Sequence, residues 1–99
     1  MKMAFVVYYE YVDAQVMDML KTLGIDYYTR WEHLTGKGHN TEPHIGVGTY
    51  VRMNSALMIA FEEEAPLAAL TAAIIAANEK ARRPDERIRL FQVPLERIV

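Results

Sequence analysis

The sequence contains no cysteine, which excludes disulfide scaffolds, thiolate catalysis and cysteine-ligated zinc or iron–sulfur sites. It also lacks a strong excess of charge, because 11 basic residues stand against 13 acidic ones and give a net charge of −2. Nucleic-acid binders use a broad positive field, so we expect no nucleic-acid partner. The longest apolar run, Ala65–Ala77, is interrupted by Pro66 and Thr71 and is too short to cross a bilayer.

Catalytic and targeting motifs are scarce as well. Met1-Lys2-Met3 leads directly into a strand-like segment without the pattern of a secretory signal, so we expect a cytoplasmic protein that is not embedded in a membrane. Ser55 is the one serine, and no nucleophile-elbow motif surrounds it. The sequence therefore predicts a protein that is not an enzyme.

The apolar share of 52% is high enough for a folded core, and no repeat or linker divides the chain. We therefore expect a single domain over residues 1–99. Hydrophobic periodicity predicts four strands and two helices in the order βαββαβ. The strands are expected at Met3–Tyr9, Tyr27–Leu34, Ala56–Phe61 and Arg87–Val93, and the helices at Asp13–Leu23 and from about Pro66 to the turn before Pro84. This order is typical of an α+β ferredoxin-like sandwich, with a four-stranded antiparallel sheet and two helices on one face.

The first and third predicted strands are apolar on both of their faces. In a ferredoxin-like sheet these two strands occupy the centre, and two helices cover one face of the sheet. Large exposed apolar patches are rare on monomers, and no membrane segment is available to cover the second face. We therefore expect further copies of the same chain to cover it in a homo-oligomer.

Residues 35–48 form a long predicted loop that holds four of the five glycines. His33, His39 and His44 lie in or beside it and are candidate ligands of a divalent metal. Their spacing matches no closed zinc motif, so exposed loop or strand histidines remain the alternative.

Gly36-Lys37-Gly38 offers one ammonium group and open backbone N–H groups to an anion, or is a plain turn. It is not a phosphate-binding P-loop, because Trp31 stands where that motif needs a glycine.

Basic residues also gather at the predicted turn after the second helix, where Arg82, Arg83, Arg87 and Arg89 lie close in sequence. They either complement the helix end or clamp a phosphate or carboxylate group. The candidate anion-binding residues of the chain are Arg30, Gly36, Lys37, Gly38, Arg82, Arg83 and Arg87.

Three stretches together resemble the P-II-like (PII-like) signal-transduction proteins. They are Leu23-Gly24-Ile25, Glu32 through Gly36-Lys37-Gly38-His39, and Phe91-Gln92-Val93-Pro94-Leu95-Glu96-Arg97-Ile98. They are similar to the family's helix ending, to the entry of its long T-loop and to its closing strand. The resemblance implies a homotrimer of ferredoxin-like subunits that binds an effector, commonly an adenine nucleotide, in clefts between subunits.

The resemblance further implies that the T-loop docks on a target, such as a transporter or a metabolic enzyme. Glu42, Pro43 and Ile45 would then be docking residues, and residues 41–46 resemble the loop of relatives associated with metal or ion transport. The chain departs from the family where residues 81–87 replace the glycine-rich B-loop, so we interpret it as a divergent member.

The resulting hypothesis is a non-catalytic sensor that binds a nucleotide-like anion or a divalent metal and signals through residues 35–48. The alternative is a small dimeric α+β barrel enzyme that uses a histidine or tyrosine as acid or base. A structural interaction domain without a ligand is a third alternative.

Overall fold

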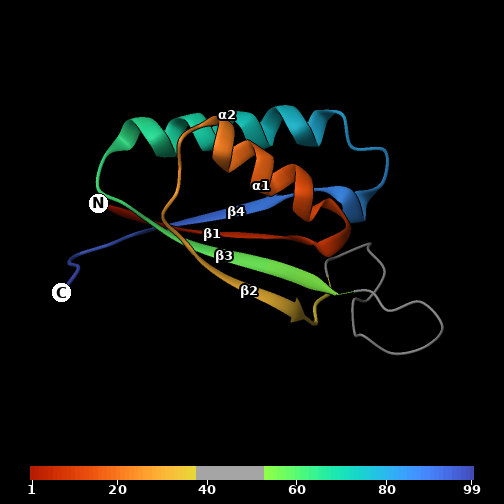
Figure 1. Ribbon diagram of the computed structural model, residues 1–99, viewed down its shortest axis with the longest axis horizontal. Helices are drawn as coiled ribbons and strands as arrows, with labels where there is room; N and C mark the ends of the chain where they lie inside the picture. Colours follow the sequence, from red (N-terminus) through yellow and green to blue (C-terminus); the bar gives the residue numbers. More distant parts are fainter. Residues whose placement is uncertain (38–52) are drawn as a thin grey trace.

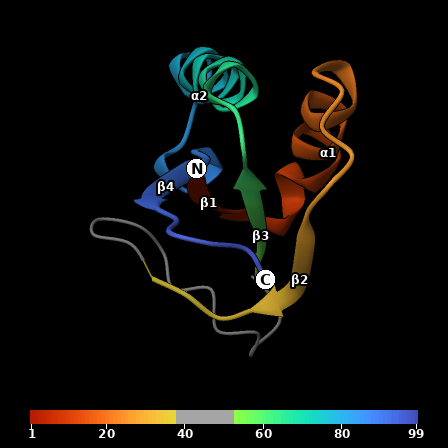
Figure 2. The same cartoon turned by 90° about the vertical axis from the view of Figure 1, so that its left-hand side faces the viewer.

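The computed structural model of the chain describes residues 1–37 and 53–99 (Figure 1). Its strands and helices follow the expected βαββαβ order, with two short 3-10 turns that the sequence did not predict. The elements are β1 (Lys2–Tyr9), η1 (Glu10–Val12), α1 (Asp13–Thr22), β2 (Thr29–Leu34), β3 (Asn54–Phe61), α2 (Glu64–Glu79), η2 (Pro84–Glu86) and β4 (Arg89–Pro94). Both helices lie over the same face of the sheet (Figure 2). The predicted fold class is confirmed.

The sheet has the order β2-β3-β1-β4, and its neighbouring strands are all antiparallel. The two strands with apolar residues on both faces, β1 and β3, therefore lie in the centre as expected. Directly opposed residues of an antiparallel pair point to the same face, so the register assigns each side chain to a face. Val6, for example, lies opposite Leu57 of β3 and Leu90 of β4.

The face under the helices forms the core. On β1 and β3 it carries side chains that are each at most 2% exposed, namely Ala4, Val6, Tyr8, Leu57, Ile59 and Phe61. The helices close over them with apolar residues spaced three and four apart, which places these residues on one side of each helix. The helix contribution consists of Val16 and Leu20 from α1 and Leu67, Leu70 and Ile74 from α2.

The opposite face, called the open face below, is also mostly apolar but carries no helix. It is formed by Met3, Phe5, Val7, Tyr9, Trp31, Ala56, Met58, Ala60, Phe91 and Val93. Trp31, Phe91 and Val93 are 42%, 51% and 42% exposed. Arg89, opposite Val7, is the one charged residue of this face within the paired strands.

The first helix ends as the sequence predicts. Gly24 has φ +74°, a backbone conformation that glycine adopts without strain. Its N–H donates to the Lys21 carbonyl (3.1 Å), and the Ile25 N–H donates to the Leu20 carbonyl (2.9 Å). These two hydrogen bonds are those of a Schellman motif, which satisfies helix-end carbonyls and directs the buried Ile25 back toward the core.

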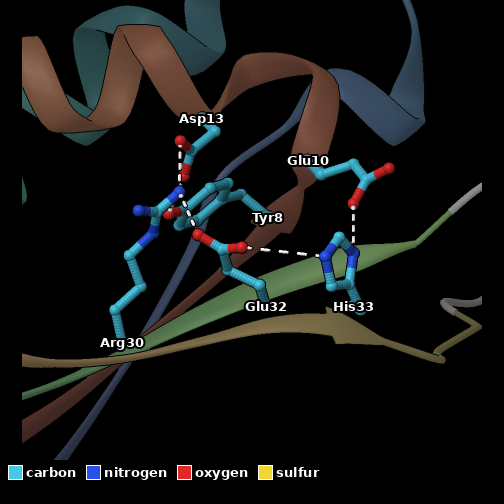
Figure 3. Close-up of polar contacts among 6 residues, drawn as sticks. All are labelled: Tyr8, Glu10, Asp13, Arg30, Glu32 and His33. Atoms are coloured by element: carbon cyan, nitrogen blue, oxygen red, sulfur yellow. Dashed lines mark hydrogen bonds and ion pairs between the residues drawn. The ribbon is translucent and has the colours of Figure 1, made fainter.

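The expectation for β2 needs two corrections. The strand begins at Thr29 and not at Tyr27, and the regular alternation of side chains that a strand should have fails at His33. The register against β3 shifts between Trp31 and Leu34, and His33 has φ +59°. In a regular strand, the side chains of Glu32 and His33 would point to opposite faces. Because of the irregularity, both point to the same side of β2 (Figure 3). Among the described residues, no helix is long and apolar enough to cross a membrane.

Candidate functional site

A hollow of about 290 Å³ lies at the end of the sheet from which the loop departs. It is bounded by the end of β1, residues 34–37, the start of β3, η2 and the start of β4. These segments are far apart in sequence, and the antiparallel order brings them to one end of the sheet. The hollow therefore joins the root of the loop to the turn that follows α2.

Three cationic side chains of the part of the chain that the structure describes line this hollow: Lys37, Arg87 and Arg89. Within residues 1–37 and 53–99, Arg87 and Arg89 have no carboxylate partner. One carboxylate, Asp85, also lines the hollow; its side chain is 8% exposed and lies 3.7 Å from Arg83 Nε. The described residues of the hollow thus combine a net positive charge with aromatic walls from Tyr9 and Phe91, a combination that suits an anion with an apolar or ring portion.

The root of the loop approaches β3 closely at Gly36. A Cβ atom on Gly36 would lie 2.6 Å from the side-chain nitrogen of Asn54, and both residues line the hollow. A larger residue at position 36 would displace Asn54 within the hollow. This contact gives Gly36 a packing role beside the anion-binding role that the sequence suggested.

The structure brings together Gly36, Lys37 and Arg87 from the predicted anion-binding set. Arg82 and Arg83 are exposed and do not line the hollow, while Gly38 lies outside the described residues. Arg89, which the sequence placed in the same basic group, joins the hollow instead.

The last member of the set, Arg30, lies on the helix-covered side of β2, within a network of polar contacts (Figure 3). Its Nη2 lies 2.5 Å from Asp13 Oδ2 and 2.9 Å from Glu32 Oε1. Burial opposes the charge of Arg30 most strongly, yet Asp13 and Glu32 outweigh it and raise the pKa of the guanidinium. Arg30 therefore ties β2 to the start of α1.

Tyr8 completes the inner end of this network by donating a hydrogen bond from its hydroxyl to Asp13 Oδ1 at 2.7 Å. Burial and the adjacent Asp13 carboxylate raise the pKa of the Tyr8 phenol far above its usual value, because both disfavour the phenolate. Tyr8 is thus a neutral donor that satisfies a carboxylate next to the core.

His33 lies at the outer end of the network, with its Nδ1 3.5 Å from Glu10 Oε2 and its Nε2 3.7 Å from Glu32 Oε2. Its side chain is 69% exposed. Among residues 1–37 and 53–99, no three histidine or acidic side chains are grouped as a metal site would require. The other candidate ligands, His39 and His44, and the docking residues Glu42, Pro43 and Ile45 lie outside the described residues.

A second hollow of about 400 Å³ lies at the far end of the sheet, beside the start of α2. Its charged residues are Glu62 and Glu63, and no cationic residue lines it among the described residues. Although it is larger, it does not touch the root of the loop. The hollow with Lys37, Arg87 and Arg89 is therefore the better candidate for an anionic effector.

The fold and this site define an α+β sheet protein with a cationic hollow at the root of the predicted loop. No protein-family model and no curated protein matches the sequence. Solved structures do match it, over nearly the whole chain. The structure of CPII from Thiomonas intermedia K12 bound to ADP and bicarbonate has a TM-score of 0.68 and 17% identity, covering 97% of this chain and 88% of that one.

A second structure of CPII, a nitrogen regulatory PII-like protein, is bound to ADP, AMP and bicarbonate. It has a TM-score of 0.62 and 16% identity, covering 99% of this chain and 94% of that one. A chain from Thermus thermophilus described as a PII-like signaling protein has a TM-score of 0.57 and 17% identity, covering 93% of this chain and 83% of that one. The chain is folded like the PII-like nitrogen regulatory proteins, and the resemblance drawn from its motifs is confirmed at the level of the fold.

Proposed function

We propose that the chain is a divergent PII-like regulatory protein of the cytoplasm, a single domain without catalytic activity. In this proposal a small anionic effector binds in the hollow formed by Lys37, Arg87 and Arg89, and the loop of residues 35–48 carries the signal to a target. The observation that carries the proposal is that the hollow includes both the root of the loop and two arginines without carboxylate partners among the described residues.

The open face supports the oligomeric part of the proposal. Its ten apolar residues extend across four strands, and Trp31, Phe91 and Val93 remain about half exposed in the single chain. Burying such a face stabilises association by roughly 25 cal/mol for each Å² of apolar surface removed from water. We propose that three copies meet through this face, as the PII-like resemblance implies, and that the hollows then lie in clefts between copies.

An adenine nucleotide is the effector that we propose first. Phosphate groups pair with arginine and lysine, and a base packs against aromatic side chains, which the hollow supplies in Tyr9 and Phe91. The similar CPII structures both hold ADP and bicarbonate, and one of them also holds AMP. A divalent metal comes second, because among the described residues His33 is not part of a group of three histidine or acidic side chains that could hold a metal ion.

Signalling would follow from the position of the effector. A ligand that contacts Gly36 and Lys37 binds best to the loop arrangements that keep these groups over the hollow. It would therefore change the distribution of conformations of residues 35–48 and, with it, the surface that these residues present to a target. The target in this proposal is a transporter or a metabolic enzyme, contacted through Glu42, Pro43 and Ile45.

Titration calorimetry with ADP, AMP and bicarbonate tests the effector. We expect Lys37→Ala and Arg87→Ala each to weaken ADP binding by about tenfold or more, because each removes a charge-assisted contact. Arg82→Ala is the matched control, since it removes the same charge from outside the hollow and should change affinity by less than about twofold. Wild-type protein that binds none of the three ligands more tightly than about 1 mM would contradict the effector proposal.

Light scattering tests the assembly. We expect wild-type protein to have the mass of a trimer, and Phe5→Glu to have the mass of one chain, because it places a carboxylate in the middle of the open face. The control, Ala72→Glu, adds the same charge on the exposed side of α2 and should leave the mass unchanged. A monomeric wild-type protein at high concentration would remove the basis for shared clefts.

The enzyme alternative receives less support. Tyr8 is a neutral donor held by Asp13, with a pKa raised away from the range of a useful base. His33 is largely exposed and does not line either of the two hollows described above. A dimeric mass in the same light-scattering measurement would favour this alternative.

A further inference from the structure

We infer that Asn78 of α2 is a positioning residue for the cationic hollow, which it serves by fixing the backbone that presents Arg87 and Arg89. The inference rests on the proposed function, in which the two arginines bind an anion. Asn78 does not line the hollow and lies on the helix layer, so its action passes through one intermediate residue, Ile88.

Asn78 holds both backbone polar groups of Ile88 with its side-chain amide. Its Nδ2 donates to the Ile88 carbonyl at 2.7 Å, and its Oδ1 accepts from the Ile88 N–H at 2.8 Å. A paired arrangement of this kind reproduces what a neighbouring strand would supply. It satisfies two groups whose burial without partners would be costly, and it fixes the orientation of the peptide units on either side of Ile88.

The sheet itself does not supply this support to Arg87. The ladder between β1 and β4 begins at the pair Val7 and Arg89, so residues 87 and 88 precede the strand. The backbone N–H of Arg87 makes one longer hydrogen bond, to the Pro84 carbonyl at 3.3 Å. The connection between η2 and β4 is therefore held chiefly by the Asn78 amide.

The direction of the arginines follows from the side chain between them. Ile88 is 2% exposed and packs into the core beneath the helices. Arg87 is extended, with φ −72° and ψ 139°, and side chains in an extended segment alternate between faces. With Ile88 buried on one side, Arg87 and Arg89 are directed to the other, where both line the hollow.

A double-mutant cycle between Asn78 and Arg87 tests this inference, with ADP as the ligand in titration calorimetry. We expect Asn78→Ala to weaken ADP binding by about tenfold, because the guanidinium is then no longer held in place. In protein that already carries Arg87→Ala, the same change should weaken binding by less than about twofold, because Arg89 is also held by its pairing with Val7 of β1. An equal loss of affinity on both backgrounds would show a general structural effect and overturn the inference.

Thr71→Val is the matched control within the same helix. Thr71 donates a hydrogen bond from its hydroxyl to the Leu67 carbonyl at 2.9 Å. Both residues belong to α2, so this hydrogen bond does not connect the helix to β4. Its loss should lower stability without changing the affinity for ADP. If Asn78→Ala does not fold, Asn78→Asp replaces it in the cycle, because the carboxylate still accepts the Ile88 N–H.

Hydrogen exchange tests the same contact without a ligand. The Ile88 amide should exchange slowly in wild-type protein and in Thr71→Val, and faster by about tenfold or more in Asn78→Ala, while amides in the centre of β1 stay protected. Unchanged protection of Ile88 would overturn the inference. Failure of wild-type protein to bind ADP contradicts the effector proposal, whereas failure of the exchange result contradicts the role of Asn78.

Discussion

The two faces of the sheet are both mostly apolar, but they have different surroundings. Leu57 and Met58 are neighbours in β3, and one is fully buried under the helices while the other lies on the open face. Alternation along one strand thus serves two purposes. The covered face stabilises the fold of the single chain, and the open face is the surface through which we propose that copies associate. The apolar character of a residue therefore does not by itself tell whether the residue belongs to the core or to a surface for association.

The largest effect is expected on the covered face, for Leu57→Ala. Leu57 is 0% exposed within the core, and truncating a buried leucine removes its transfer free energy and leaves a cavity. We expect the free energy of unfolding to fall by about 2–5 kcal/mol in urea denaturation. A loss below about 1 kcal/mol would show that the core closes over the cavity or is packed more loosely than the burial of Leu57 indicates.

The second effect concerns Tyr8, a buried polar residue of the covered face, and depends on pH. Its pKa is raised in the folded state, so its contribution to stability is complete below about pH 10 and is lost as pH rises from there toward the folded value. We expect Tyr8 to contribute a fall of about 1.4 kcal/mol per pH unit to the free energy of unfolding in that range. Urea denaturation at several alkaline pH values measures the slope.

In Tyr8→Phe this part of the alkaline slope should disappear, with a loss of about 1 kcal/mol near neutral pH from the missing hydrogen bond to Asp13. Tyr11→Phe is the matched control, because Tyr11 is 79% exposed and should leave the slope unchanged. Equal slopes in wild-type protein and Tyr8→Phe would contradict the pKa assignment.

A smaller effect is expected on the open face, for Met58→Ala. In protein dilute enough to be monomeric, the free energy of unfolding should fall by less than about 1 kcal/mol, because the side chain is only partly buried in one chain. Dissociation on dilution, followed by light scattering, should occur at higher concentration than for wild-type protein. A loss in the monomer as large as that of Leu57→Ala would remove the distinction between the faces.

The smallest effect is expected at the edge strand, for Glu32→Gln. Its carboxylate lies 2.9 Å from Arg30, but its side chain is 47% exposed, and exposed ion pairs contribute little. We expect thermal unfolding at low salt to show a loss of less than about 0.5 kcal/mol, and salt at about 1 M to remove the difference. A loss that persists in high salt would indicate that Glu32 has a packing role beyond its charge.

The sequence predicted the architecture because the informative features are local. Apolar residues on both faces of β1 and β3 indicated central strands, and Gly24 indicated the end of α1. The shift in β2 was not predictable in the same way. His33 adopts its positive φ beside Glu10 of η1, and only the fold brings that carboxylate near. Contacts between distant segments leave no periodic signal in the chain.

The candidate site could also be predicted only in part from the sequence. Glycine and basic residues at Gly36, Lys37 and Arg87 indicated an anion site, and the structure places these three around one hollow. Arg30 has the same chemistry, yet Asp13, 17 residues earlier, holds it on the other side of β2. The contact of Asn78 was not predictable from the sequence, because an asparagine near a helix end is common. Its partner is the backbone of Ile88, ten residues later.

The irregular edge of the sheet has a consequence for how copies of the chain meet. Edge strands invite the addition of foreign strands, and continued addition produces fibres. On β2 the shifted register and the charged side chains of Arg30 and Glu32 interrupt the regular row of backbone groups that an added strand needs. The β2 margin thus discourages ribbon-like growth, which favours face-to-face contact for the assembly that we propose.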